Sequence, residues 1–223
     1  MNRSRGLALV DSGRFRTYAT AICYCEFLGW GIVATILGPA LPFVAREFRL
    51  DFDAQGLLTG AINLGSVFMI LWGFVTDRFG KARVLIIGYI ILTISIALVY
   101  GSFSFPSLYF GYLLIGIGAA IIEIPQNTLI SDLYSWNRAS ALNRLHLFYG
   151  IGALIGPLVS TLIVLSGRGW KLAYGLALMI FVPVVISTPF VFGIQTKGEL
   201  FPQQDPRASL TNGEIGNSLR TLV

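Results

Sequence analysis

The sequence predicts an all-α membrane protein in which six transmembrane helices form two inverted three-helix repeats. Three observations lead to this prediction: an apolar composition, basic residues that lie between apolar segments, and a likeness between the first three and the last three of those segments. Hydrophobic residues make up 55% of the 223 residues and charged residues only 12%, and the mean hydropathy is +0.73. Soluble domains carry about 25% charged residues, so an ordinary soluble protein is excluded.

Six apolar segments have the length that a bilayer crossing requires, which is about 20 residues. They cover residues 17–41, 55–75, 84–102, 107–130, 145–165 and 171–192. Residues 1–194 are therefore expected to form one transmembrane domain. The polar residues 195–223 are expected to form a cytoplasmic tail that leads toward a missing seventh helix. The first apolar segment is too long to be a cleavable signal peptide.

The basic residues set the expected orientation. Twelve of the 16 Lys and Arg residues lie before residue 17, in the connections 76–83 and 131–144, or after residue 194, and the rest lie in the alternate connections. Because cytoplasmic loops are enriched in Lys and Arg, both termini are expected in the cytoplasm, in a multi-pass protein of the plasma (cell inner) membrane. The net charge of +5 thus reflects topology, and no nucleic-acid partner is expected.

The likeness between the two sets of segments predicts an inverted repeat, an arrangement found in many secondary transporters. The first and fourth segments each contain an acidic residue followed by proline, and the second and fifth each contain closely spaced glycines. The matched residues are Glu26 with Pro39 and Pro42, Glu123 with Pro125, Gly56 with Gly60, and Gly152 with Gly156.

The connection 73–83 reads GFVTDRFGKAR. In this turn Gly80 permits a positive φ, and Asp77 is placed to accept bonds from helix-end amides or from Arg83. The order of the residues resembles the helix 2–3 signature of the major facilitator superfamily, G-x-x-x-D-R-x-G-R/K. The residues of this motif are Gly73, Asp77, Arg78, Gly80, Lys81 and Arg83.

This resemblance implies a role for the loop and a partner for the chain. In that family the loop residues form a cytoplasmic gate that latches one six-helix half against the other. Full members have twelve spans, so the resemblance implies an N-terminal half whose partner is a C-terminal six-helix half or a second copy of this chain. A small-molecule solute and the lipid bilayer are the other partners that it implies.

Glu123 lies deep in the fourth apolar segment. A carboxylate at mid-membrane costs about 2.5–3.5 kcal/mol, so Glu123 is expected to face a cavity or a partner. Asn127 follows one helical turn later on the same face, and Gln126 lies beside it. A carboxylate and an amide on one face suit the hydroxyl groups of a sugar, which both donate and accept hydrogen bonds.

The same region resembles the fucose-permease-like branch of the superfamily, which consists of sugar–proton symporters. Glu123, Asn127, Asn143 and Phe148 match the pattern of that branch, and His146 stands where glutamine is usual. The resemblance implies symport of a sugar or another small polar solute, driven by an ion gradient.

One departure from that branch concerns the first segment. The acidic residue of those permeases would fall at Gly38, whereas this chain carries Glu26, three turns earlier. Glu26 and Glu123 lie at similar depths, about 10–14 Å from the inner ends of their helices, given a rise of about 1.5 Å per residue. Two nearby carboxylates favour proton binding by one of them, so this pair is a candidate for proton coupling. Either H⁺ or Na⁺ is compatible with the sequence as the coupling ion, and no other cofactor is expected.

A competing interpretation is a drug or metabolite exporter of the same fold. Gly152, Gly156 and Pro157 partly match the glycine–proline element of drug–proton antiporters, but the glycines that usually follow are absent. The helix 4 arginine of antiporters would fall at Tyr112. Close helix packing through small residues explains the glycines better. A third interpretation is a six-span fragment or accessory subunit with no transport of its own.

Three further residues are candidates for the pathway. His146 is the only histidine, and since no second histidine or thiolate pair accompanies it, it is expected to hydrogen-bond, line a cavity or relay a proton and not to bind a metal. Asn63 either bonds across helices or contacts the solute, and Trp30 lies deep enough to stack on a sugar. No nucleotide-binding loop or nucleophile triad is found, so an enzyme is not expected.

Overall fold

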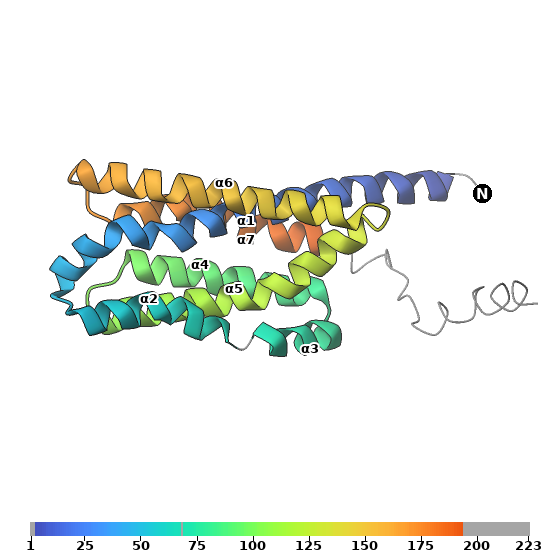
Figure 1. Cartoon of the computed structure of the whole chain (residues 1–223). Coiled ribbons are helices and arrows are strands. Elements are labelled where there is room, and N and C mark those ends of the chain that lie inside the picture. Colours follow the sequence, from blue (N-terminus) through green and yellow to red (C-terminus); the bar gives the residue numbers. More distant parts are fainter. Residues whose placement is uncertain (1–2, 68, 194–223) are drawn as a thin grey trace, which may run out of the picture.

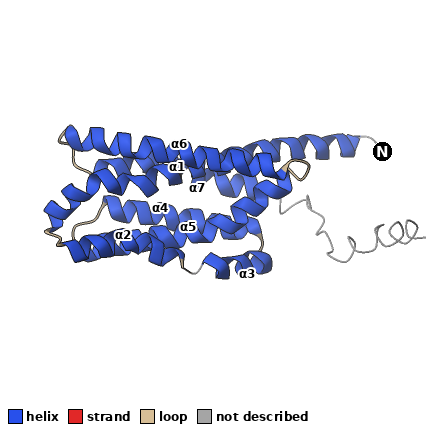
Figure 2. Cartoon of the chain, in the orientation of Figure 1, coloured by secondary structure: helices blue, strands red, loops and turns tan. Residues whose placement is uncertain are grey.

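The computed structural model describes residues 3–67 and 69–193, which form helices joined by short connections (Figures 1 and 2). The helices are α1 (Arg3–Phe48), α2 (Phe52–Ser66), α3 (Met69–Phe79), α4 (Lys81–Tyr100), α5 (Phe105–Leu133), α6 (Arg138–Leu165) and α7 (Lys171–Gly193). Six stretches of the described residues are long and apolar enough to cross a membrane, with α2 and α3 together forming the second. The prediction of six helical spans is therefore confirmed. The predicted tail at 195–223 lies outside the described residues.

The second span is interrupted, where the sequence predicted one continuous helix over 55–75. α2 ends at Ser66 and α3 begins at Met69. The Ser66 hydroxyl donates to the carbonyl of Ile62 at 3.0 Å and to that of Gly116 on α5 at 3.3 Å. A serine that bonds its own helix in this way often bends it, and this bond lies at the last residue of α2.

Several helices extend beyond their predicted bounds because a helix does not stop where the apolar zone stops. α6 begins at Arg138 instead of residue 145, and its added first turns carry three exposed polar residues, Arg138, Asn143 and Arg144. α5 begins at Phe105 behind a capping box, in which the Ser107 amide donates to the Ser104 hydroxyl and the Ser104 amide donates to the Ser107 hydroxyl. Such a box satisfies two amides that the first turn leaves free.

The helices are arranged in two layers, with α1, α6 and α7 in one and α2, α3, α4 and α5 in the other (Figure 1). α1 packs along α6 and α7, α5 packs along α2 and α4, and α4 packs against α7 across the layers. Exchanging α1 with α5, α2 with α6 and α4 with α7 maps each of these contacts onto another or onto itself. The predicted inverted repeat of two three-helix units is thus confirmed in the packing.

Close glycine contacts follow the same symmetry. At four positions an added Cβ would lie only 2.0–2.3 Å from a backbone oxygen of the facing helix, so the backbones approach as closely as glycine alone permits. The four positions are Gly31 and Gly152, where α1 meets α6, and Gly65 and Gly116, where α2 meets α5.

The expected glycine correspondence is therefore partly wrong. Gly152 and Gly156 face α1 as helix-packing residues, and the neighbouring Pro157 lies half-buried within α6. Gly56 and Gly60, which were matched with them from spacing, have no atom within 4 Å of an added Cβ. The repeat-related contact is made at Gly65, five residues beyond Gly60 and nine beyond Gly56, because the helix crossing point decides which glycine is covered.

Within the described residues, three hydrogen bonds that involve side chains join the two layers. One partner of each bond lies in α5 or in the turn that follows it. The Tyr112 hydroxyl bonds that of Tyr174 on α7. The Gln126 amide donates to a carbonyl of α1 at 3.0 Å. The Tyr134 and Thr20 hydroxyls bond each other at 3.2 Å. We refer to these three bonds as the layer seam.

Candidate functional site

A polar cluster lies in the middle of the bundle, where α1, α4 and α5 meet. The Tyr89 hydroxyl of α4 donates to Oε1 of Gln126 at 2.9 Å, and Nε2 of Gln126 donates to the Cys23 carbonyl of α1 at 3.0 Å. All three residues are fully buried. Buried amide and hydroxyl groups are costly unless they are bonded, and here Gln126 satisfies one partner on each of two helices.

Glu26 lies in the same cluster, one turn after Cys23 on α1. It is 0% exposed, and neither of its carboxylate oxygens has a hydrogen-bond partner among the described residues. The Gln126 side chain is adjacent to it. An isolated charge in such surroundings is very unfavourable, so this carboxyl group is the chemically least satisfied group of the bundle interior.

A second polar pair lies on the neighbouring part of α5. Nδ2 of Asn127 donates to Oε1 of Glu123 at 3.3 Å, and both residues are half-buried. Oδ1 of Asn127 is buried and has no partner within the described residues. The pair therefore offers a carboxylate acceptor and an unused amide acceptor, one helical turn apart, beside the buried cluster.

The other predicted pathway residues are not brought into this cluster. Trp30 is half-buried, and Asn63, Asn143 and His146 are exposed. The His146 ring meets Phe27 edge-on with 5.4 Å between centroids. Hydrogen bonds from the four side chains are absent from the described part of the chain, and so is any group of three or more potential metal ligands. These residues lie around the cluster instead of completing it.

The loop motif adopts a turn at the junction of α3 and α4. Gly80 has φ +86°, a conformation that favours glycine, and Gly73 lies within α3. Lys81 forms an ion pair with Asp132 at the end of α5. Asp77 was expected to accept bonds from helix-end amides or from an arginine, but the described residues include no such bond.

The two arginines of the motif both lie at the surface. Arg78 and Arg83 are both exposed, and the Arg78 guanidinium lies 5.9 Å from the centroid of the Phe79 ring. Both side chains therefore remain available at the surface, while the lysine of the motif is the member that fastens the turn to α5.

Two members of the buried cluster escaped prediction from the sequence. Cys23 was interpreted as a small apolar residue, and it contributes through its backbone carbonyl, which no side-chain pattern reveals. Tyr89 could have been singled out from the sequence, because a tyrosine hydroxyl inside the apolar segment 84–102 needs a hydrogen-bond partner when it is buried. The partner itself could not be inferred without the packing of α4 on α5.

Replacing Gln126 with leucine is expected to lower the free energy of unfolding by about 2–3 kcal/mol, because the Tyr89 hydroxyl and the Cys23 carbonyl would both lose their partner in the bundle interior. Thermal unfolding of the purified chain in detergent measures this loss. Thr128→Val is the matched control, since the Thr128 hydroxyl on the same helix bonds only its own helix, at 2.8 Å to Ile124. Equal melting of the leucine variant and the natural chain would contradict the bridging role.

Comparison with known families matches residues 25–218 to the model of the Major Facilitator Superfamily. The match covers most of the chain, and the chain belongs to this superfamily. The predicted family is thus confirmed, and this membership places the chain among multi-pass membrane transport proteins and not among enzymes.

Relatives with assigned names are distant and longer. The chain is 24% identical over 178 residues to a Protein TsgA homolog of Buchnera aphidicola, covering 77% of this chain and 45% of the relative. It is 28% identical over 214 residues to synaptic vesicle glycoprotein 2A of Rattus norvegicus, covering 91% of this chain and 28% of the relative. It is 26% identical over 164 residues to the cercosporin MFS transporter CTB4 of Cercospora nicotianae, covering 71% and 32%. The chain thus spans less than half the length of these relatives.

Solved structures show the same fold. The POT family transporter PepTSo superposes with a TM-score of 0.66 at 20% identity, over 82% of this chain and 37% of that structure. A bacterial homolog of the human lysosomal transporter Spinster, in an inward-facing and unoccupied conformation, gives 0.64 at 18% identity, over 91% and 48%. The six helices therefore correspond to part of a larger transporter fold.

Proposed function

We propose that this chain serves as the N-terminal half of a secondary active transporter, with H⁺ as the coupling ion and a sugar or similar small polar solute as the cargo. The observation that carries the proposal is Glu26, a fully buried carboxyl group whose two oxygens have no hydrogen-bond partner among the described residues. In this position the neutral, protonated carboxyl group is more stable than the charged carboxylate, which is the property that a proton carrier requires.

The surroundings of Glu26 favour H⁺ over Na⁺. A hard cation such as Na⁺ needs several free oxygen ligands around it, as the oxygen-rich sites of other hard cations illustrate. The amide oxygen of Gln126 already accepts from Tyr89, and the carbonyl of Cys23 already accepts from Gln126. Few free oxygens are left, whereas a proton needs only the carboxylate itself.

The Glu123–Asn127 pair favours a hydroxyl-rich solute. Glu123 is an acceptor, and Asn127 has a buried Oδ1 without a partner among the described residues. A vicinal diol supplies two donors at the spacing of neighbouring groups, and its oxygens accept as well. This pairing agrees with the sugar–proton symporters that the sequence resembles, and we assign solute contact to Glu123 and Asn127 and proton binding to Glu26.

The proposed activity requires a second body. Alternating access works by rocking one half against another around a central site, and this chain spans 45% of one relative and 28% of another. We place the complete transporter in the plasma membrane with both termini of this chain in the cytoplasm, as the distribution of basic residues predicts. The second body is a C-terminal six-helix half or another copy of this chain.

Uptake into proteoliposomes tests the proposal. Vesicles that contain the chain, alone or together with a separately produced C-terminal half, receive radiolabelled monosaccharides with and without an acidic exterior. The expected result is uptake that an inward proton gradient accelerates several-fold and that a protonophore abolishes. Uptake that responds to Na⁺ and not to pH would contradict the choice of ion, and no uptake of any monosaccharide would contradict the choice of solute.

A metabolite exporter is the second candidate, and one relative, named as a cercosporin transporter, favours it. Against it, the position of the antiporter arginine is held by Tyr112, which is fully buried and bonded to Tyr174. A third candidate is an accessory subunit without transport. Dye efflux from the same vesicles would support the exporter, and vesicles inert to both sugar and dye would support the subunit.

A further inference from the structure

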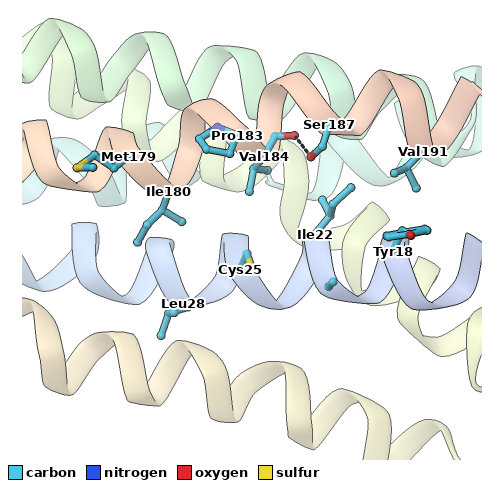
Figure 3. Close-up of a pocket in the computed structure, with 11 residues that line it drawn as sticks. Tyr18, Ile22, Cys25, Leu28, Met179, Ile180, Pro183, Val184, Ser187 and Val191 are labelled. Carbon is cyan, nitrogen blue, oxygen red and sulfur yellow. Dashed lines mark hydrogen bonds between the residues drawn. The ribbon is translucent and has the colours of Figure 1, made fainter. Parts of the chain in front are cut away.

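A groove of about 470 Å³ runs between α1 and α7 on the outside of the bundle (Figure 3). One wall is formed by α1 from Tyr18 to Leu28 and the other by α7 from Met179 to Val191. It lies apart from the polar cluster, which is enclosed by α1, α4 and α5. Nothing in the proposed transport mechanism uses this groove.

Contacts between α1 and α7 mark where the groove lies along the helices. Gly29 is so close to Phe181 that an added Cβ would be 2.9 Å from its ring. Toward the N-terminus, Phe15 meets Phe192 edge-on with 5.9 Å between centroids. The groove occupies the stretch between these two contacts, at a depth that lies within the first and last membrane spans.

The groove has the length of one leaflet of the bilayer. The ten residues from Tyr18 to Leu28 rise about 15 Å along α1, which is half of a hydrocarbon core about 30 Å thick. The groove therefore has the length and the apolar walls that a hydrocarbon chain of one leaflet requires.

The groove walls and the end of the groove differ in chemistry. The walls are almost entirely apolar, and the Ser187 hydroxyl is turned back onto its own helix, donating to the Val184 carbonyl at 3.1 Å. At one end Tyr18 is 58% exposed, and tyrosine is favoured at the level of lipid headgroups. Arg14 is exposed one helical turn beyond Tyr18, on the same face of α1. A cation thus stands where the headgroup of a lipid in the groove would lie.

We propose that this groove binds one acyl chain of an anionic phospholipid, whose phosphate is held by Arg14 and the Tyr18 hydroxyl. The lipid comes from the leaflet on the N-terminal side, which the basic residues predict to be cytoplasmic, where anionic lipids are enriched. Such a lipid fills the space that the separation of α1 and α7 leaves and fastens the two helices together. The site is separate from the proposed proton and solute groups and stands whether or not these transport.

Photolabelling of the full chain tests the site. The chain is reconstituted in nanodiscs that contain phosphatidylglycerol or phosphatidylcholine with a photoreactive group on one acyl chain, and labelled peptides are mapped by mass spectrometry. The expected result is labelling concentrated on α1 and α7, stronger for phosphatidylglycerol. Even labelling of all lipid-facing helices would overturn the proposal, because it would show ordinary boundary lipid. Cross-links between two copies through α1 and α7 in place of lipid labelling would also overturn it.

Two variants with matched controls sharpen the test. Ala21→Phe fills the groove and is expected to lower the α1 and α7 labelling about tenfold, the change that a loss of about 1.4 kcal/mol in binding produces. Ala97→Phe, on an exposed part of α4, is expected to leave it unchanged. Arg14→Gln is expected to abolish the preference for phosphatidylglycerol, whereas Arg138→Gln keeps it. Unchanged labelling in Ala21→Phe overturns the acyl-chain site, and an unchanged preference in Arg14→Gln overturns the headgroup assignment.

Discussion

Substitution of Gly152 by alanine is expected to destabilise the six-helix bundle by about 3 kcal/mol, the upper end of the cost of overpacking a close contact. The added Cβ would lie 2.1 Å from the Leu28 oxygen and 3.0 Å from the Ile32 amide nitrogen, and both are backbone atoms that cannot turn away. α1 and α6 would have to move apart along their contact. Thermal unfolding of the purified chain, with size-exclusion chromatography before and after heating, measures the effect.

The chain contains its own controls for this prediction. Gly150→Ala lies two residues away on α6, where an added Cβ has no atom within 4 Å, and it is expected to be neutral or slightly stabilising. The repeat predicts the same contrast on α2, with Gly65→Ala destabilising and Gly60→Ala tolerated. Equal stability of Gly150→Ala and Gly152→Ala would show that α1 and α6 do not approach as closely as described.

Replacement of Glu26 with leucine is expected to raise the free energy of unfolding by about 1–3 kcal/mol while abolishing proton-driven uptake. The carboxyl group is fully buried, and neither oxygen has a partner among the described residues. An apolar side chain of similar volume therefore removes an unmet polar group and loses no bond. Melting in detergent and sugar uptake driven by a pH gradient give the two readings on one purified protein.

Glu123→Gln is the companion variant for Glu26→Leu. Glu123 is half-buried and accepts from Asn127, so its amide analogue is expected to melt within about 1 kcal/mol of the natural chain. Its effect should appear as a higher KM for the solute and not as a loss of pH dependence. A Glu26→Leu chain that is less stable, or that still takes up sugar in response to pH, would remove Glu26 from the proposed mechanism.

The spans were predictable from the sequence because burial in a bilayer requires long apolar runs. The run at 145–165 gave the C-terminal end of α6 correctly, but its start at Arg138 was missed, since a helix continues into water without any change in apolar character. The break between α2 and α3 was missed for a different reason. At the end of α2 the Ser66 hydroxyl bonds a carbonyl on α5, and such a contact between distant segments leaves no pattern in the sequence.

The candidate site was predictable in part. Helical rise placed Glu26 and Glu123 at similar depth, and in the structure Glu26 is fully buried while Glu123 is half-buried. Gln126 was singled out as a pathway residue because it is polar within an apolar segment. Its bridging of Tyr89 and the Cys23 carbonyl depends on how three helices meet, and spacing along one helix carries no information about that.

The layer seam has a mechanical consequence. Its three bonds involve Tyr112 and Gln126 of α5 and Tyr134 in the turn that follows it. Between them the layers touch mainly through apolar side chains, which form no directional bonds. Each of the three hydrogen bonds must break before one layer can slide against the other. Any sliding of one layer past the other would therefore break bonds made by α5, the helix that carries Glu123, or by the turn after it.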